Sequence, residues 1–252
     1  MITVLADLHI HTALSPCASN QMLPRRIVQT AAARNLSMIA VCDHNSAANA
    51  PAVIEAARRD TRGKLVVVPG IEITTREEVH VLGLFPAVGS ALSVGQSVLQ
   101  TLPEIKSKNR KARDPDSEQW ILDSRDRRTG SERRLLSAAS TYRLGEAVDL
   151  IQRYSGLAVA AHVDRRAFSV LGQLGFFPEG VHFCAAEISS AGVARGRCSE
   201  FQHHRFPLIS SSDSHFLEDI GCTCTALHVA EPSFAELALA LQDRADRRHW
   251  IA

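Results

Sequence analysis

Residues 2–11 read ITVLADLHIH, an apolar and β-branched run that ends in two histidines separated by one residue. The run predicts a buried strand that ends near Asp7–His11. Because side chains alternate along a strand, His9 and His11 point in the same direction and can reach one ion. This stretch therefore predicts the first strand of the fold and, at the end of that strand, a candidate site.

Apolar runs that alternate with helical patterns continue along the rest of the chain. We expect further strands at Met38–Cys42, Leu65–Val68 (punctuated by Pro69-Gly70 before Ile71–Thr74), Val79–Phe85, Leu157–Ala161, Phe183–Ile188, Leu208–Ser210 and Thr223–Val229. Helices are expected from Pro24, around residues 53–57, and at Leu144–Tyr154, Phe168–Leu174, Val193–Gln202 and Pro232–Gln242. Strands alternating with helices over 252 residues predict one domain, residues 1–252, with a parallel sheet closed or nearly closed into a barrel.

Composition excludes several classes of protein. The net charge is +1, from 28 basic and 27 acidic residues, so no overall field attracts nucleic acid or a membrane surface. Apolar runs fall far short of the roughly 18 residues that cross a bilayer, and the first residues do not predict a secretory signal. The six cysteines are scattered, which favours a reduced, cytoplasmic setting. Aromatic residues make up only 5%, which argues against an extended platform for stacking bases.

One segment interrupts the regular pattern, and we expect a charged insertion or flap near residues 88–140. Glu104–Arg134 holds 17 charged residues in 31, ten basic and seven acidic. A hairpin around Trp120–Arg127 fits its few large apolar residues. Because acids interleave with the bases, a solvated flap is favoured over a nucleic-acid-binding patch.

Potential metal ligands follow or lie in the predicted strands: His9, His11, His44, Glu72, His80, His162, Asp213 and His215. The ends of parallel strands in a barrel meet at one face, so these groups are expected to share one cup. A single histidine at a strand end is more often structural than a ligand. Neutral imidazoles crowded together without a cation, however, would leave lone pairs unsatisfied. The set therefore predicts a site for zinc, iron or manganese.

These residues also resemble a known family. The motifs are Asp7-Leu8-His9-Ile10-His11-Thr12, Asp43-His44, Pro69-Gly70-Ile71-Glu72, His80, His162 and Ser212-Asp213-Ser214-His215. Their ordered set is similar to that of the PHP (polymerase and histidinol phosphatase) domain, over nearly the whole chain. The resemblance implies a distorted (β/α)7 TIM-like barrel that binds two or three divalent metal ions and hydrolyses phosphate esters.

The resemblance also implies how the ligands are shared. One metal would take His9, His11, Glu72 and Asp213, a second would take Glu72, His80 and His162, and a third would take His44 and His215. Many members have an aspartate or histidine ligand in the turn where this chain reads Ser15-Pro16-Cys17. Cys17 is either a thiolate ligand, which would favour a softer metal, or a turn residue.

Residues next to these ligands have two interpretations each. Asp7 and Asp43 either orient ligand histidines as hydrogen-bond acceptors or cap loops. Arg165 and Arg166 either bind a phosphate or are surface residues at the start of a helix. Asn45 either contacts substrate or turns its loop.

Two metals bridged by one carboxylate can supply a bridging hydroxide near neutral pH, so no protein nucleophile is assigned. The resemblance favours a nucleotide or a short single-stranded oligonucleotide as substrate. The low net charge argues against a long duplex, which needs many phosphate contacts. The alternatives are a phosphatase of the histidinol-phosphate type and a non-catalytic metal-binding module that supports a partner.

Overall fold

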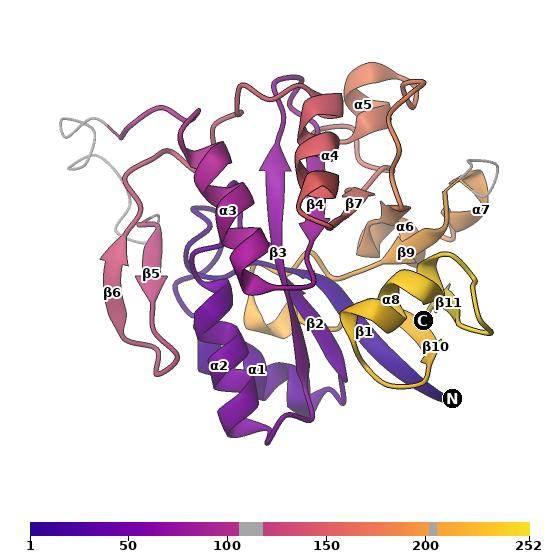
Figure 1. Ribbon diagram of the computed structural model, residues 1–252, viewed down its shortest axis with the longest axis horizontal. Coiled ribbons are helices and arrows are strands. Elements are labelled where there is room, and N and C mark those ends of the chain that lie inside the picture. The colour runs from indigo at the N-terminus through magenta and orange to yellow at the C-terminus, as the bar shows by residue number, and fades with distance from the viewer. Residues whose placement is uncertain (106–117, 202–205) are drawn as a thin grey trace.

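The computed structural model describes residues 1–105, 118–201 and 206–252 (Figure 1). The strands are β1 (Ile2–Ile10), β2 (Met38–Val41), β3 (Val66–Thr74), β4 (His80–Leu84), β5 (Trp120–Leu122), β6 (Arg128–Ser131), β7 (Leu157–Ala160), β8 (Ala185–Ile188), β9 (Leu208–Ser210), β10 (Thr225–Val229) and β11 (Arg248–Ile251). The helices are α1 (Pro24–Ala33), α2 (Ala50–Asp60), α3 (Val88–Leu99), α4 (Leu144–Arg153), α5 (Val170–Leu174), α6 (Ser190–Ala194), α7 (Cys198–Phe201), the 3₁₀ helix η3 (Leu217–Asp219) and α8 (Phe234–Leu241). The middle of the predicted insertion and Gln202, the predicted end of a helix, lie outside the described residues.

Nine of the described strands form one curved sheet in the order β11-β10-β1-β2-β3-β4-β7-β8-β9, and β5 and β6 form a separate pair. The segment after β9 returns to β1, where Ser214 forms a parallel bridge with Ile10. In the same region the Leu8 amide donates to Ser211 Oγ at 3.3 Å. The sheet is therefore nearly closed, and the expected distorted barrel is confirmed.

The sheet is mixed, whereas the sequence predicted parallel strands. β4 is antiparallel to both β3 and β7, and β10 is antiparallel to β1. Only residues 75–79 separate β3 from β4, which is too short for the crossover that parallel strands require. The reversal pairs Thr74 at the end of β3 with His80 at the start of β4. His80 therefore lies at the same edge of the sheet as Glu72.

The Pro69-Gly70 pair, expected to punctuate the third strand, lies inside the continuous strand β3. Pro69 has no N–H to donate, but its carbonyl accepts from the Phe85 amide at 2.9 Å. A Cβ atom at Gly70 would lie 2.6 Å from Cys42 Sγ, so glycine allows β2 and β3 to approach closely. The pair is a packing feature rather than a turn.

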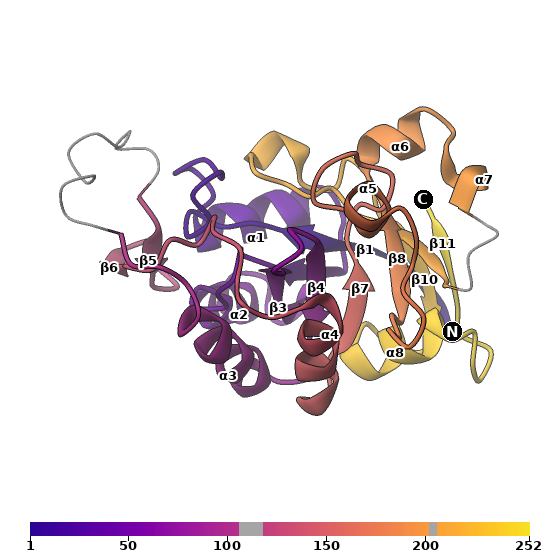
Figure 2. The ribbon, with the colours of Figure 1, turned by 90° about the horizontal axis from the view of Figure 1, so that it is seen from above.

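Helices cover the outside of the sheet, and α3 is one of them (Figure 2). Ala91, Val94 and Val98 of α3 are fully buried and belong to the same core as β3, β4 and α4. The departure from the barrel pattern thus begins after this helix rather than at residue 88. Between Val193 and Gln202 the expected single helix is instead two short ones, α6 and α7, separated near Gly196, whose φ is +69°.

The expected hairpin is present as β5 and β6, paired antiparallel. It is anchored to the loop after β1, because the Trp120 amide donates to the Ala13 carbonyl at 2.9 Å. Asn49 links the same elements: its amide Nδ2 donates to the Trp120 carbonyl and to Thr12 Oγ1. Figures 1 and 2 place the hairpin at the opposite end of the molecule from β11.

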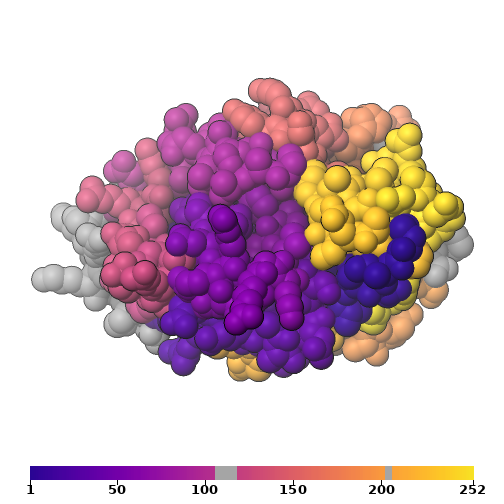
Figure 3. All heavy atoms as spheres, turned by 60° about the horizontal axis from the view of Figure 1, so that its bottom comes forward, coloured from indigo at the N-terminus to yellow at the C-terminus, as the bar shows by residue number. Residues whose placement is uncertain are grey.

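The C-terminal strands complete the sheet on the other side of β1. β10 pairs with β1, and β11, which the sequence analysis did not predict, pairs with β10. Figure 3 shows the start of β1 lying against the C-terminal segment. Among the described helices, none has the length and apolar character needed to cross a membrane.

Candidate metal centre

The buried carboxylate of Glu72, near the end of β3, is surrounded by imidazoles. Its Oε1 lies 2.9 Å from His80 Nδ1 and 3.2 Å from His162 Nε2. Its Oε2 lies 3.0 Å from His44 Nδ1 and 3.4 Å from His11 Nε2. Residues from four different stretches of the chain therefore meet at one carboxylate.

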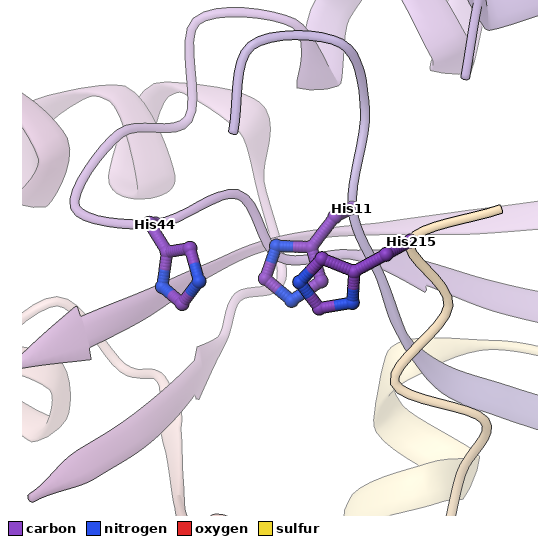
Figure 4. A group of neighbouring side chains, drawn as sticks. All are labelled: His11, His44 and His215. Atoms are coloured by element: carbon purple, nitrogen blue, oxygen red, sulfur yellow. The ribbon is translucent and has the colours of Figure 1, made fainter. Parts of the chain in front are cut away.

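Asp213, in the segment after β9, forms the second acidic centre. Its Oδ1 lies 3.2 Å from His11 Nε2 and 3.4 Å from His9 Nε2. His215 follows two residues later, and its ring stacks on that of His11 with 4.2 Å between the ring centroids. Figure 4 shows His11, His44 and His215 gathered around one space although each follows a different strand.

The two carboxylates of this cluster are held in their charged form, which suits a cation. Burial by itself would raise the pKa of Glu72, but the imidazoles of His80, His44 and His9 lower it well below its usual range. Burial likewise opposes ionisation of Asp213, and His9 followed by His11 outweighs it and lowers its pKa. Burial, together with His215, lowers the pKa of His11 well below its usual value. The site therefore combines ionised carboxylates with an imidazole that keeps its lone pair.

The donor atoms fit metal ions better than they fit one another. His44 Nδ1 and Glu72 Oε2 lie 3.0 Å apart, yet they are not aligned for a hydrogen bond. These two atoms and His162 Nδ1 are buried without a hydrogen-bond partner among the described residues. The Nε2 atoms of His9 and His11 face each other at 3.1 Å. Buried polar atoms are normally satisfied, so this convergence is the arrangement expected of metal ligands.

The described residues contain three groups of potential metal ligands. Within each group, the ligand atoms all lie within 4.8 Å of one another. They are His9, His11 and Glu72; His44, Glu72 and His80; and His11, His44 and His215. These groups contain six of the eight predicted histidines and carboxylates. The other two adjoin them, since His162 lies against Glu72 and Asp213 against His11. Glu72 belongs to two of the groups, and in one of them His44 joins Glu72 and His80, where the resemblance implied His162.

Glu187, at the end of β8, was not among the predicted site residues. Its Oε2 lies 3.0 Å from His9 Nδ1, and its side chain is buried. The same oxygen accepts from the His162 amide at 3.2 Å. A carboxylate on one ring nitrogen fixes the tautomer and leaves the other nitrogen for a metal. Its position at the end of a predicted strand was the available signal.

Asp7 and Asp43 act on loops rather than directly on ligand imidazoles. Asp7 accepts from the Ser212 amide and hydroxyl and from the Gly221 amide, at 3.0, 2.6 and 2.8 Å. Asp43 accepts from Thr12 and from Ser15 Oγ, the latter at 2.7 Å. Because Ser15 Oγ also lies 3.0 Å from His11 Nδ1, Asp43 reaches a candidate ligand only through this hydroxyl.

Asn45 does not face a substrate, which corrects one of its two interpretations. It is fully buried, and its Nδ2 donates to the Leu136 and Ala138 carbonyls at 2.9 Å each. Its Oδ1 accepts from the Thr74 amide at 2.9 Å. With every side-chain group used on the backbone, Asn45 turns its loop and fastens residues 136–138 to it.

The two arginines after His162 differ from each other. Arg165 Nη1 lies 2.6 Å from Asp213 Oδ2, and its side chain is 43% exposed. It therefore places a guanidinium at the mouth of the site. Arg166 is exposed, and no hydrogen bond or ion pair of its side chain is found among the described residues. Only Arg165 is held at the candidate centre.

Cys17 lies at the rim of the same cluster. Its Sγ is 3.1 Å from His215 Nε2. Partial desolvation raises the pKa of the Cys17 thiol, but the contacts with His215 and His44 outweigh it and lower the pKa to about 7. A thiolate is thus accessible where other members of the resembled family have a ligand, and its role as ligand stays a prediction.

Comparison with known proteins finds a curated relative that matches in part and solved structures with a similar fold. The 5'-3' exoribonuclease Rnm of Salmonella typhimurium is 33% identical over 84 residues, which are 32% of this chain and 27% of that protein. The lesion-specific endonuclease Q of Pyrococcus furiosus has a similar structure, with a TM-score of 0.68 at 17% identity. That match covers 98% of this chain and 58% of the endonuclease. The chain thus spans less than two thirds of either protein.

A third similarity covers most of both chains. A putative metal-dependent phosphoesterase of Bifidobacterium adolescentis aligns with a TM-score of 0.54 at 19% identity, over 83% of this chain and 87% of that one. Family models identify a PHP domain at residues 7–173 and a PHP-associated segment at residues 199–245. The first model covers most of the candidate ligands and more than half of the sequence, and the chain therefore belongs to the PHP domain family.

Proposed function

We propose that this protein is a metal-dependent phosphoesterase that hydrolyses a phosphate ester of a nucleotide or short oligonucleotide. The observation that carries the proposal is the carboxylate of Glu72, whose two oxygens are each flanked by two imidazoles within 3.4 Å. A carboxylate in this position can bridge two divalent ions. Bound metal ions would supply Lewis-acid activation of the phosphoryl group and of the attacking water.

The chain's own residues have three roles in this proposal. The ligands are His9, His11, His44, Glu72, His80, His162, Asp213 and His215, with Cys17 as a further candidate for a third ion. Glu187 orients His9, and Asp43 orients His11 through Ser15. Arg165 offers N–H groups to a phosphoryl oxygen, since its contact with Asp213 uses one of its nitrogens. Zinc, manganese and iron all suit this donor set.

A substrate of the nucleotide or nucleic-acid class is supported by the similar proteins rather than by the fold, and the short length is supported by the charge of this chain. Rnm is a 5'-3' exoribonuclease, and endonuclease Q has been solved with a 27-mer duplex carrying an abasic lesion. For this chain, a net charge of +1 supports a small or single-stranded phosphate rather than a long duplex. Histidinol phosphate is the alternative small substrate.

The proposal is tested by a substrate panel: histidinol phosphate, 5′-mononucleotides, a nucleoside bisphosphate and a short single-stranded oligonucleotide. Phosphate and nucleotide release would be measured with added manganese, and again after the metals are removed with a chelator. We expect turnover of a nucleotide or oligonucleotide that the chelator abolishes. His162→Ala should lose this turnover, while His182→Ala, a change at an exposed histidine, should keep it.

The panel separates the rival functions. Preference for histidinol phosphate would replace the nucleotide substrate with the amino-alcohol phosphate. Silence on every substrate, with metal bound in the expected amount, would contradict the enzyme and favour a non-catalytic metal-binding module. Full activity of His162→Ala would contradict the ligand assignment.

A further inference from the structure

Phe168 places an aromatic ring at the candidate metal centre, beyond the shell of ligands. Its ring stacks on the imidazole of His80, with 4.7 Å between the centroids and an interplanar angle of 17°. Its side chain is nevertheless 43% exposed. One face of the ring therefore covers His80, and the remaining surface meets solvent beside the site.

The backbone holds Phe168 in a restrained position. Its φ is +58°, a conformation that a bulky residue rarely adopts. Its carbonyl accepts from the His80 amide at 2.8 Å, which ties it to the start of β4. The next residue, Ser169, is fully buried, and its hydroxyl donates to the Arg165 carbonyl. Backbone strain of this kind is retained where the surroundings enforce it, and it concentrates at functional sites.

The segment from His162 to Ser169 thus presents two different groups at the site. Arg165 supplies a guanidinium next to Asp213, and Phe168 supplies an exposed aromatic face next to His80. A nucleotide offers the matching pair, an anionic phosphate and a planar base. Stacking on one ring is tolerant of base identity because every base has a π-face. The low aromatic content argued against an extended stacking platform, but a small substrate with one base requires only one ring.

We propose that Phe168 is a specificity-determining residue whose exposed face stacks against the base adjacent to the phosphate that is hydrolysed. This inference rests on the proposed function and adds to it the recognition of a nucleobase. The group that stacks on Phe168 is the base of a free nucleotide or of the terminal nucleotide in a single strand. Without the base, a sugar phosphate would gain nothing from Phe168.

The test compares a nucleotide with its counterpart that lacks the base, for example 5′-AMP with ribose 5-phosphate. The nucleotide would be the one that turns over fastest in the panel. In Phe168→Ala, we expect kcat/KM for the nucleotide to fall roughly 5- to 150-fold, the range of one base–aromatic stack. For the sugar phosphate it should stay within about twofold, since no stack is lost.

Three further variants separate stacking from shielding of His80. Phe168→Trp keeps an aromatic face and should retain the preference for the nucleotide. Phe168→Leu keeps an apolar cover on His80 but should lose the preference as Phe168→Ala does. Phe176→Ala removes another phenylalanine, 62% exposed, and serves as the matched control that leaves both substrates unaffected. Circular dichroism and bound-metal content would establish that each variant is folded.

A binding measurement makes the result independent of turnover. The monophosphate of 2-aminopurine riboside loses fluorescence when its base stacks, so it can be titrated into the metal-free protein. We expect quenching with the wild type, Phe168→Trp and Phe176→Ala, and its loss with Phe168→Ala. Equal quenching by the wild type and Phe168→Ala would overturn the proposal. So would an equal fall in kcat/KM for the nucleotide and the sugar phosphate in Phe168→Ala. Absence of any turnover in the wild type would contradict the proposed function instead, and the titration would still decide the stacking.

Discussion

Glu187 fixes the orientation of the His9 ring at the candidate centre. Its Oε2 is 3.0 Å from His9 Nδ1, which leaves His9 Nε2 facing Glu72 and Asp213 at 3.5 and 3.4 Å. Glu187→Gln keeps the side-chain volume but removes the charge that holds this ring orientation. We expect metal affinity to fall by roughly 10- to 100-fold, the usual effect of losing such a partner. Competition with a coloured chelator measures it.

The matched control for this change is Glu55→Gln, on the exposed face of α2. It removes the same charge from the protein without touching the cluster, so metal affinity should stay at the wild-type level. If Glu187→Gln also bound metal as tightly as the wild type, Glu187 would not position His9.

Asn45 is predicted to act on stability and not on substrate. Asn45→Ala leaves the buried Leu136 and Ala138 carbonyls and the Thr74 amide without their partner. We expect the free energy of unfolding to fall by at least about 2 kcal/mol, because buried polar groups would lose their hydrogen bonds. Urea denaturation measures it, and KM of the folded fraction should be unchanged.

Asn35→Ala is the control for the backbone of this position. Asn35 has a φ of +57°, close to the +53° of Asn45, but it is exposed. Asn35→Ala therefore has only the cost of placing alanine at a positive φ, and it should lower the free energy of unfolding less than Asn45→Ala does. An equal loss in both variants would mean that the hydrogen bonds of Asn45 contribute nothing measurable.

The histidines and carboxylates that the fold gathers at one place were predictable from the sequence, although their role as metal ligands stays a prediction, whereas residues defined by a distant partner were not. Histidines and carboxylates at strand ends indicated a metal site because such groups are costly to bury together without an ion. Asn45 stood beside a candidate ligand and was open to two interpretations, since its three backbone partners lie 29 to 93 residues away. Glu187 was missed for the same reason: His9, its partner, is 178 residues distant.

At the scale of elements, most strands and helices were predicted from the apolar patterns, but helix α3 and the direction of the strands were not. Apolar runs look the same in either direction, so β4 was expected to be parallel to its neighbours. The five-residue connection to β3 was the physical signal for reversal. The reversal matters to the site because it places His80 at the start of β4 rather than at its end. β11 was missed because only four residues form it, two of them polar.

Helix α8 is fastened to the C-terminal strands by one ion pair. Glu236 accepts two hydrogen bonds from the Arg247 guanidinium, at 2.8 and 2.9 Å, and one from the Ala230 amide. The hydrogen bonds from Arg247, and then the one from Ala230, lower the pKa of Glu236 below its ordinary value of 4.5. A carboxylate with a lowered pKa stabilises the folded state above its unfolded pKa, and this stabilisation is lost as the pH falls through the folded value.

Glu236→Gln should therefore be less stable than the wild type at pH 7. The difference in unfolding free energy should shrink as the pH falls below 4.5, because the wild-type carboxyl then takes up a proton. Urea denaturation of both proteins between pH 3 and 7 measures the difference. A difference that stays constant with pH would show that the charge of Glu236 is not what stabilises this contact.

At the scale of the whole molecule, the candidate ligands come from almost the full circuit of the barrel. His9, in β1, and Glu72, in β3, lie in the sheet, while His162 and Asp213 follow β7 and β9. They become neighbours only when the sheet curves back on itself near Ile10 and Ser214. An unfolded chain offers no such cluster, so a metal ion that binds here binds the folded state alone.

Metal binding should consequently stabilise the entire fold. At a free metal concentration of 100 times Kd, the expected gain is about 2.7 kcal/mol. For a chain of this size that corresponds to a rise in Tm of roughly 5–10 °C. Thermal unfolding followed by circular dichroism, with manganese or zinc added and then removed by a chelator, measures it. His11→Ala should lose most of the rise because His11 belongs to two of the three ligand groups, whereas His182→Ala should respond as the wild type does. A Tm that changes with neither metal nor chelator would contradict the proposed metal centre, because ligands that come from all around a barrel could not bind an ion tightly without stabilising the barrel.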